Sequence, residues 1–192
     1  SSFTPQWRER PEVIGHFFDI LLNPEKAYPV LKVMLETGFL EVFLPEFTPI
    51  RYRVQFDVYH LYTVDEHLLR TVRFVHEQIQ EVRSRNSDQA VKIDLSARDM
   101  AREPILFLAA LLHAIGKGRG HGHAERGARM VEAIGQRLHL TREETDLLAF
   151  LIRHHLVLAE IALKRDLADE KPIERCAMTV EDRRRLDMRY LP

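Results

Sequence analysis

The sequence predicts an all-α protein, and three observations lead to that prediction. Apolar residues recur every three or four positions along most of the chain, which is the period of an amphipathic helix. Proline, glycine and a capping box stand at the places where helices would begin and end. The alternation of apolar and polar residues that marks a half-buried strand is missing from the sequence. We therefore expect a helical bundle with an N-terminal helical extension, divided into residues 1–50 and 51–192.

The first fifty residues predict two helices followed by irregular structure. Residues 1–10 are polar and without periodicity, so we expect a loose lead-in. A helix should begin at Pro11, because proline suits a first turn, and should end at Asn23-Pro24. The next helix should end at Gly38, a favourable residue just past a C-terminus. An apolar turn over residues 39–44 and an irregular, extended segment over residues 45–53 should follow.

The middle of the chain predicts three longer helices. Helical periodicity is found over residues 59–82, 98–113 and 121–138. In the first of these, His67 stands beside the apolar stripe. The polar residues 84–96 are expected to form a flexible linker to the second. Residues 105–112 are apolar on every side, which predicts a helix buried all round that ends at His113.

A further helix should begin near Thr141. The segment from Thr141 to Glu144 is a capping box, which satisfies backbone N–H groups at a helix start. The apolar face of this helix leads to His154 and His155. We expect a short helix over residues 156–163, a charged loop over residues 164–171 and an Arg-rich helix over residues 180–191.

Composition excludes several classes of function. The chain has 192 residues, with 28 Lys and Arg against 29 Asp and Glu, so it lacks the basic field of a dedicated DNA-binding protein. Its longest apolar run is too short to span a membrane. The single Cys176 cannot form an internal disulfide, which favours the cytoplasm. Because the sequence begins Ser-Ser without Met, we expect an excised piece of a longer protein.

The histidines carry the functional signal. An isolated histidine on a helix is usually structural or solvated, and we expect this of His16, His76 and His139. His67, His113 and the pair His154-His155 differ, because three separate helices would each bring an imidazole to the edge of an apolar face. An unpaired imidazole at the end of a buried helix is costly. Imidazoles gathered from several helices predict a site for Zn, Mn or Fe.

A glycine-rich basic loop follows His113 directly. It brings in four candidate residues, namely Lys117, Arg119, His121 and His123. Lys117 and Arg119 would contact phosphate oxygens, because cations and backbone N–H groups in such loops bind phosphate. The loop and the imidazoles together predict a metal-assisted phosphate site. Position 114, where that site would want a carboxylate, is Ala.

Other chemistries fit poorly. The sequence has no nucleophile elbow, no phosphate-binding loop of the nucleotide triphosphatase type and no dinucleotide-binding glycine motif after a strand. It has no paired cysteines for a zinc knuckle. Cys176 lies in a polar segment without a nearby histidine, so we do not expect a nucleophile there.

These residues resemble a known family. The Leu-His-x-Ile-Gly-Lys-Gly segment, the later His-x-x-x-Gly and the histidine pair resemble the HD superfamily of metal-dependent phosphohydrolases. Five segments are similar to the HD domain, and to the region just before it, of bifunctional uridylyltransferase/uridylyl-removing enzymes: GFLEVFLPEF (38–47), QFDVYHLYTVDEHLLR (55–70), HAIGKGRGHGHAERGA (113–128), FLIRHHL (150–156) and LKRDLADEKPIERCA (163–177). The resemblance covers nearly all of residues 11–191.

The resemblance implies an HD-domain helical bundle that hydrolyses the phosphodiester between UMP and a tyrosine of a PII signalling protein. It assigns metal ligation to His67, His113, a carboxylate at position 114, His123 and one of the pair His154 and His155, of which we favour His155. Lys117 would face the phosphate with Arg119 beside it, and Lys117 and His123 are the catalytic candidates. The implied cofactor is a divalent metal (Mn, Fe, Mg or Zn). The implied partners are the uridylylated PII protein, UMP and the rest of the full-length enzyme.

The sequence departs from the family pattern at two metal ligands. Ala114 stands where the family has the Asp of its name. The family's closing Asp lies in a segment like LTVAD that would follow Pro192, and Asp187 stands one turn too early to replace it. Removing a residue that only hydrogen-bonds to a metal ligand lowers metal affinity or activity about 10–100-fold, and removing a ligand itself should cost more. We therefore expect weak or absent metal binding and little hydrolysis.

Two alternatives stay open. One is an HD hydrolase of free nucleotides, such as guanosine tetraphosphate or a deoxynucleotide. The other is a non-catalytic helical module that binds a nucleotide or a protein partner through the same pocket. Motifs for attaching UMP or for sensing small molecules are missing from the sequence, so we expect neither activity.

Overall fold

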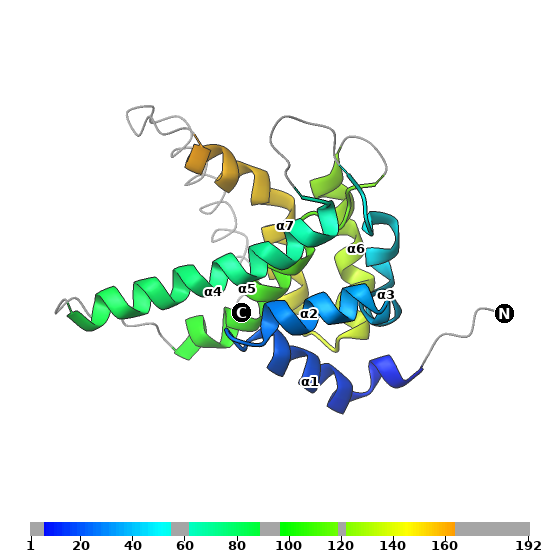
Figure 1. Cartoon of the computed structure of the whole chain (residues 1–192), viewed down its shortest axis with the longest axis horizontal. Coiled ribbons are helices and arrows are strands. Elements are labelled where there is room, and N and C mark those ends of the chain that lie inside the picture. Colours follow the sequence, from blue (N-terminus) through cyan, green and yellow to red (C-terminus); the bar gives the residue numbers. More distant parts are fainter. Residues whose placement is uncertain (1–5, 55–61, 89–96, 119–121, 164–192) are drawn as a thin grey trace, which may run out of the picture. The chain divides into compact units, whose positions relative to one another are not determined.

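The computed structural model describes residues 6–54, 62–88, 97–118 and 122–163, and every regular element in these ranges is a helix. In chain order (Figure 1) these are the 3₁₀ helix η1 (Gln6–Glu9), α1 (Pro11–Leu21), α2 (Ala27–Glu36), α3 (Phe39–Phe43), the 3₁₀ helix η2 (Pro45–Ile50), α4 (Val64–Asp88), α5 (Ala97–Leu112), α6 (His123–Arg137) and α7 (Arg142–Leu163). The all-α prediction is confirmed. The chain forms two compact units, Ser1–Arg153 and His154–Pro192. Within the described ranges, no helix has the length and apolar character needed to cross a membrane.

The first two long helices form as the sequence predicts. Helix α1 begins at Pro11, and its buried residues Ile14, Phe17 and Leu21 lie on one face. Helix α2 ends before Gly38, whose φ of 76° is the left-handed conformation that glycine adopts most readily. Both helices contribute to one hydrophobic core with α4, α5 and α6, so apolar spacing explains which faces are buried.

Three short elements differ from the predictions for this region. Residues 6–9 form a 3₁₀ helix rather than a loose lead-in, and the indole of Trp7 stacks on Phe39 with ring centroids 5.3 Å apart. Residues 39–43 form helix α3 rather than a turn, because a helix buries Leu40 and Phe43 together. Residues 45–50 form the 3₁₀ helix η2 instead of an extended segment, with Phe47 and Ile50 fully buried.

Helix α4 begins later and ends later than predicted. Tyr62 and Thr63 are not helical, and the helix runs from Val64 to Asp88, into the segment predicted as a linker. Residues 55–61, with His60, and residues 89–96 lie outside the described residues. The later start is explained by long-range contacts at the first turn, where the backbone N–H of Val64 donates to the carbonyl of Arg53 at 2.9 Å.

Helix α5 is largely buried but not on all sides. It packs against α4 and α1, and most of its residues from Ile105 to Leu112 are buried. Leu106, however, is 41% exposed, so the prediction of a helix buried all round is wrong at that position. Helical neighbours cover most of the circumference of α5 and leave the side of Leu106 open.

Helices α6 and α7 pack closely at two glycines. Ala128, Val131, Ile134 and Leu138 are buried, as predicted. A Cβ added at Gly127 would lie 3.0 Å from Cγ2 of Ile152, and one added at Gly135 would lie 2.6 Å from Oγ1 of Thr145. Helix α7 runs without a break to Leu163, so the separate helix predicted over residues 156–163 is the C-terminal part of α7. The charged loop and the Arg-rich helix predicted after it lie outside the described residues.

The capping box at the start of α7 forms as predicted, which gives a first testable expectation. The backbone N–H of Thr141 donates to Glu144 Oε2 at 2.7 Å, and the N–H of Glu144 donates to Thr141 Oγ1 at 3.2 Å. Thr141→Ala removes the hydroxyl and should lower the free energy of unfolding by about 1 kcal/mol. Urea denaturation measures this loss, and an unchanged midpoint would contradict it.

His76 is a structural histidine of the core. It is 6% exposed, its ring stacks on Phe107 with centroids 3.9 Å apart, and its Nε2–H donates to the carbonyl of Leu21 at 3.0 Å. Burial lowers the pKa of His76 below its ordinary value of 6.5, and this outweighs the effects of the Leu21 hydrogen bond and the charge of Glu103, which raise it. His76 therefore joins α4 to α1 and α5 in its neutral form.

The lowered pKa of His76 predicts a pH dependence of stability. In the unfolded chain this imidazole binds a proton near pH 6.5, whereas in the folded chain it binds one only at lower pH. The free energy of unfolding should therefore fall as the pH decreases from about 6.5 towards the folded pKa. In His76→Gln, which keeps an N–H donor but does not titrate, this part of the decline should disappear. Urea titrations of both proteins between pH 7.5 and about 5 measure the difference; parallel curves would contradict the assignment.

Candidate functional site

Two of the predicted metal ligands meet in the structure. His67 lies in the first turns of α4, and His113 is the residue directly after α5. Their Nε2 atoms are 3.0 Å apart, and their rings are nearly perpendicular, at 78°. Both side chains are half-buried. The structure therefore brings together imidazoles that are 46 residues apart in sequence, as the pattern of apolar faces predicted.

The backbone sets the orientation of the His113 ring. Its Nδ1 lies 2.9 Å from the carbonyl oxygen of Ala110, and because a carbonyl only accepts, Nδ1 carries the proton. The other ring nitrogen of His113, Nε2, then faces Nε2 of His67. A ring nitrogen fixed by a carbonyl, with the other nitrogen presented to a partner, is the usual arrangement of a metal-ligating histidine.

The spacing of the two imidazoles fits a single metal ion. Two metal–nitrogen bonds of about 2.1 Å place the nitrogens about 3.0 Å apart when they meet at the right angle of an octahedral ion. The Nε2 atoms are separated by 3.0 Å, so His67 and His113 suit adjacent positions on such an ion. The donor set is nevertheless incomplete in the described part of the chain, where no three His, Cys, Asp or Glu side chains are grouped to hold a metal. The side chain next to His113 is that of Ala114, which is fully buried and offers no oxygen.

The loop after His113 is held closely against α6. Gly116 packs on the backbone of His123 and Gly127, and a Cβ added to it would lie 2.6 Å from the Gly127 nitrogen. Nη1 of Arg126 donates to the carbonyl of Gly116 at 2.6 Å. Lys117 is half-buried within this fixed turn. Sequence reasoning missed Arg126, because a basic residue in the first turn of a helix gives no sign of a carbonyl partner ten residues away.

The other predicted site residues are placed as follows. His123 is the first residue of α6 and is half-buried. His154 and His155 are half-buried residues of α7 that belong to the second compact unit, and their role as ligands stays a prediction from sequence. Arg119 and His121 in the loop, and Cys176 and Asp187 near the C-terminus, lie outside the described residues. His16 and His139 are exposed, as expected of solvated histidines.

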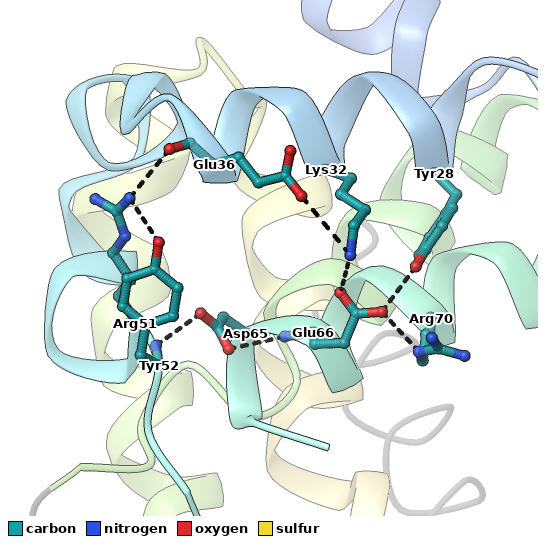
Figure 2. A network of polar contacts seen from close by, with 8 residues as sticks. All are labelled: Tyr28, Lys32, Glu36, Arg51, Tyr52, Asp65, Glu66 and Arg70. Atoms are coloured by element: carbon teal, nitrogen blue, oxygen red, sulfur yellow. Dashed lines mark hydrogen bonds and ion pairs between the residues drawn. The ribbon is translucent and has the colours of Figure 1, made fainter. Parts of the chain in front are cut away.

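A cluster of charged residues at the start of α4 was not predicted. Figure 2 shows that Glu66 accepts hydrogen bonds from residues of α2 and of its own helix. Its Oε1 lies 2.7 Å from Tyr28 Oη and 2.6 Å from Arg70 Nε. Its Oε2 is 3.1 Å from Lys32 Nζ. Burial raises the pKa of the Glu66 carboxyl, but these hydrogen bonds and the charge of Lys32 lower it by more, so the carboxylate form is favoured.

Asp65 completes this cluster from inside the fold. It is 1% exposed, its Oδ2 accepts the backbone N–H of Tyr52 at 2.7 Å, and its Oδ1 accepts the N–H of Glu66 at 2.9 Å. Two acidic residues in the first turn of a helix are a recognised helix-start signal. This signal marks where a helix starts, but it carries no information about the partners of Glu66 on α2.

Comparison with known proteins identifies the family. A family model described as "HD domain" matches residues 64–188, more than half of the chain. The match begins at the first residue of α4, three positions before His67.

Curated relatives match over nearly the whole chain. The bifunctional uridylyltransferase/uridylyl-removing enzyme of Gluconobacter oxydans is 39% identical over 189 residues, which is 96% of this chain and 20% of that protein. The enzymes with the same description from Rhodopseudomonas palustris and Azospirillum brasilense are 39% and 36% identical over 94% and 95% of the chain, and each is covered over 19% of its length. The chain thus spans about a fifth of the length of these relatives. The family match over residues 64–188 shows that the chain belongs to the HD-domain family.

Proposed function

We propose that this chain is the HD domain of a uridylyltransferase/uridylyl-removing enzyme, and that its reaction is metal-dependent release of UMP from a uridylylated PII-type protein. The observation that carries the proposal is the His67–His113 pair, with Nε2 atoms 3.0 Å apart, within a chain of the HD-domain family. HD domains are metal-dependent, and the curated relatives are described as uridylyl-removing enzymes.

The histidine pair and the loop after it would have different roles in the reaction. His67 and His113 would hold one divalent ion through their Nε2 atoms, for which their separation is suited. Such an ion supplies Lewis-acid activation of a phosphodiester and of the attacking water. Lys117, held in the turn that Arg126 fixes, would neutralise charge on the phosphate oxygens. His123, at the start of the neighbouring helix, is the candidate for moving a proton or for adding an imidazole ligand.

Ala114 weakens this site in our proposal. Its buried methyl group stands where the family supplies a carboxylate, and a carboxylate is both an anionic ligand and an oxygen donor suited to Mn or Fe. Two neutral imidazoles alone leave the charge of a divalent ion uncompensated. We therefore propose weak metal binding and low hydrolysis for this sequence. The same observation favours a second candidate function, a non-catalytic module that binds a nucleotide or a protein partner without metal.

The test is release of UMP from uridylylated PII protein in the presence of Mn²⁺. The assay compares this chain with Ala114→Asp, and Ala114→Asp with His113→Gln serves as the control without the imidazole pair. We expect strong release from Ala114→Asp, at least about tenfold less from the parent chain, and none from the control. Parallel assays on guanosine tetraphosphate and on a deoxynucleotide test the reading as a hydrolase of free nucleotides. Cleavage of those substrates alone would overturn the proposed substrate, and tight metal-free binding of UMP without any cleavage would favour the module.

A further inference from the structure

We propose that Glu66, with Asp65, is a positioning residue for His67: it fixes the first turn of α4 so that the His67 imidazole faces His113. The inference rests on the proposed function only in treating His67 and His113 as the ligand pair. Its evidence is the set of contacts around the two carboxylates, which are drawn together in Figure 2.

Glu66 joins α4 to α2 directly before His67. Its side chain is only 15% exposed and accepts three donors, from Tyr28 and Lys32 on α2 and from Arg70 one turn further along α4. Charge-assisted bonds of 2.6 Å to 3.1 Å are among the stronger polar contacts in proteins. Because Tyr28 and Lys32 both belong to α2, their bonds to Glu66 hold α2 and the first turn of α4 together.

Asp65 joins the same turn to the segment that precedes it. Its buried carboxylate accepts the backbone N–H of Tyr52, two residues after η2, and the N–H of Glu66. The N–H of Val64 donates to the carbonyl of Arg53 at 2.9 Å. The first two residues of α4, Val64 and Asp65, are therefore each hydrogen-bonded to a residue outside the helix.

Because the start of α4 is held in this way, helix geometry determines the direction in which the His67 imidazole points. Successive residues point about 100° apart around a helix, so Glu66 can face α2 while His67 faces the end of α5. The His113 ring is already fixed on its own side by the carbonyl of Ala110. A contact of 3.0 Å between Nε2 atoms fails as a hydrogen bond beyond about 3.5 Å, so a shift of about half an ångström in the first turn of α4 is enough to break it.

The chain offers a matched control for the loss of this carboxylate. Glu46 on η2 has a side chain 14% exposed and pairs with Arg137 Nη2 at 2.6 Å, which resembles the burial and pairing of Glu66. That pair joins η2 to α6, and within the described residues the hydrogen bonds of the Glu46 carboxylate are to Arg137 rather than to α4. Glu46→Ala should therefore cost a similar amount of stability without turning His67.

The experiment follows the contact between the two rings in the chelator-treated protein by the ¹⁵N chemical shifts of the Nε2 atoms of His67 and His113, which change when the hydrogen bond between them is lost. We expect Glu66→Ala to lose this contact and Glu46→Ala to keep it, with comparable losses in thermal midpoint. Persistence of the contact in Glu66→Ala, or its equal loss in Glu46→Ala, would overturn the proposal. The readout needs no metal, so it is decided independently of whether the proposed hydrolysis is found.

A second variant covers the case in which Glu66→Ala fails to fold. Tyr28→Phe combined with Lys32→Met removes both α2 donors and leaves Glu66 paired with Arg70. The ring contact should again be lost, and its survival in this folded variant would refute the role of the α2 link. In Ala114→Asp, where metal binding is expected, Co²⁺ affinity should fall about 10–100-fold on adding Glu66→Ala, and Glu66→Gln, which keeps an acceptor for Tyr28, should restore part of it.

Discussion

Ala114→Asp should make the protein less stable than the parent chain in EDTA and more stable than the parent in Mn²⁺. Position 114 is fully buried, so an added carboxylate without a partner pays the cost of leaving water, about 3 kcal/mol or more when it stays charged. An ion bound between that carboxylate, His67 and His113 stabilises the folded state relative to its metal-free form. At a metal concentration of 1,000 times the dissociation constant that gain is about 4.1 kcal/mol, which exceeds a cost of about 3 kcal/mol.

Thermal unfolding of Ala114→Asp and of the parent chain, each with EDTA and with Mn²⁺, measures this reversal in their order of stability. Ala133→Asp is the matched control, because it adds the same charge at an exposed position of α6. The control should show no specific response to Mn²⁺. If Ala114→Asp responds no more than Ala133→Asp does, position 114 does not belong to a metal site.

Gly116→Ala should destabilise the protein by about 3 kcal/mol or more, which is the largest effect we expect from a single methyl group. The added Cβ would overlap the carbonyl oxygen of His123 and lie 2.6 Å from the nitrogen of Gly127. Both are backbone atoms of α6, so no side-chain rotation relieves the overlap. The loop must move away from α6, and the bond from Arg126 to the Gly116 carbonyl is lost with it.

Gly15→Ala is the control for Gly116→Ala. Gly15 lies inside α1, and an added Cβ would meet nothing within 4 Å. Alanine exceeds glycine in helix propensity by about 1 kcal/mol, so this variant should be slightly more stable than the parent. Urea denaturation of both variants gives the comparison. A loss below about 1 kcal/mol for Gly116→Ala would show that the loop is not held against α6 as described.

The predictable part of the fold is the part that local sequence determines. Helix α1 starts at its proline, α2 ends before Gly38 and α7 starts at a capping box, because each signal acts on neighbouring residues. Helix α3 was missed because five residues form a helix only when the core takes up Leu40 and Phe43. The exposure of Leu106 depends on which helices surround α5, and periodicity carries no information about that.

The candidate site divides in the same way. His67 and His113 were found because each stands at the edge of an apolar face, and two such faces pack against each other in one core. The bonds from Arg126 to Gly116 and from Tyr28 to Glu66 join residues 10 and 38 positions apart. Only the packing of α6 on the loop and of α2 on α4 creates them, so no local pattern marks these residues as part of the site.

We propose that His67, His113 and position 114 form the metal site of an HD hydrolase. Calorimetric titration of Mn²⁺ into the parent chain, Ala114→Asp, and Ala114→Asp with His113→Gln tests this assignment. We expect one ion to bind Ala114→Asp at least about tenfold more tightly than the parent, and this gain to be lost when His113 is replaced. Equal affinity of all three proteins, or a gain that survives His113→Gln, would contradict it.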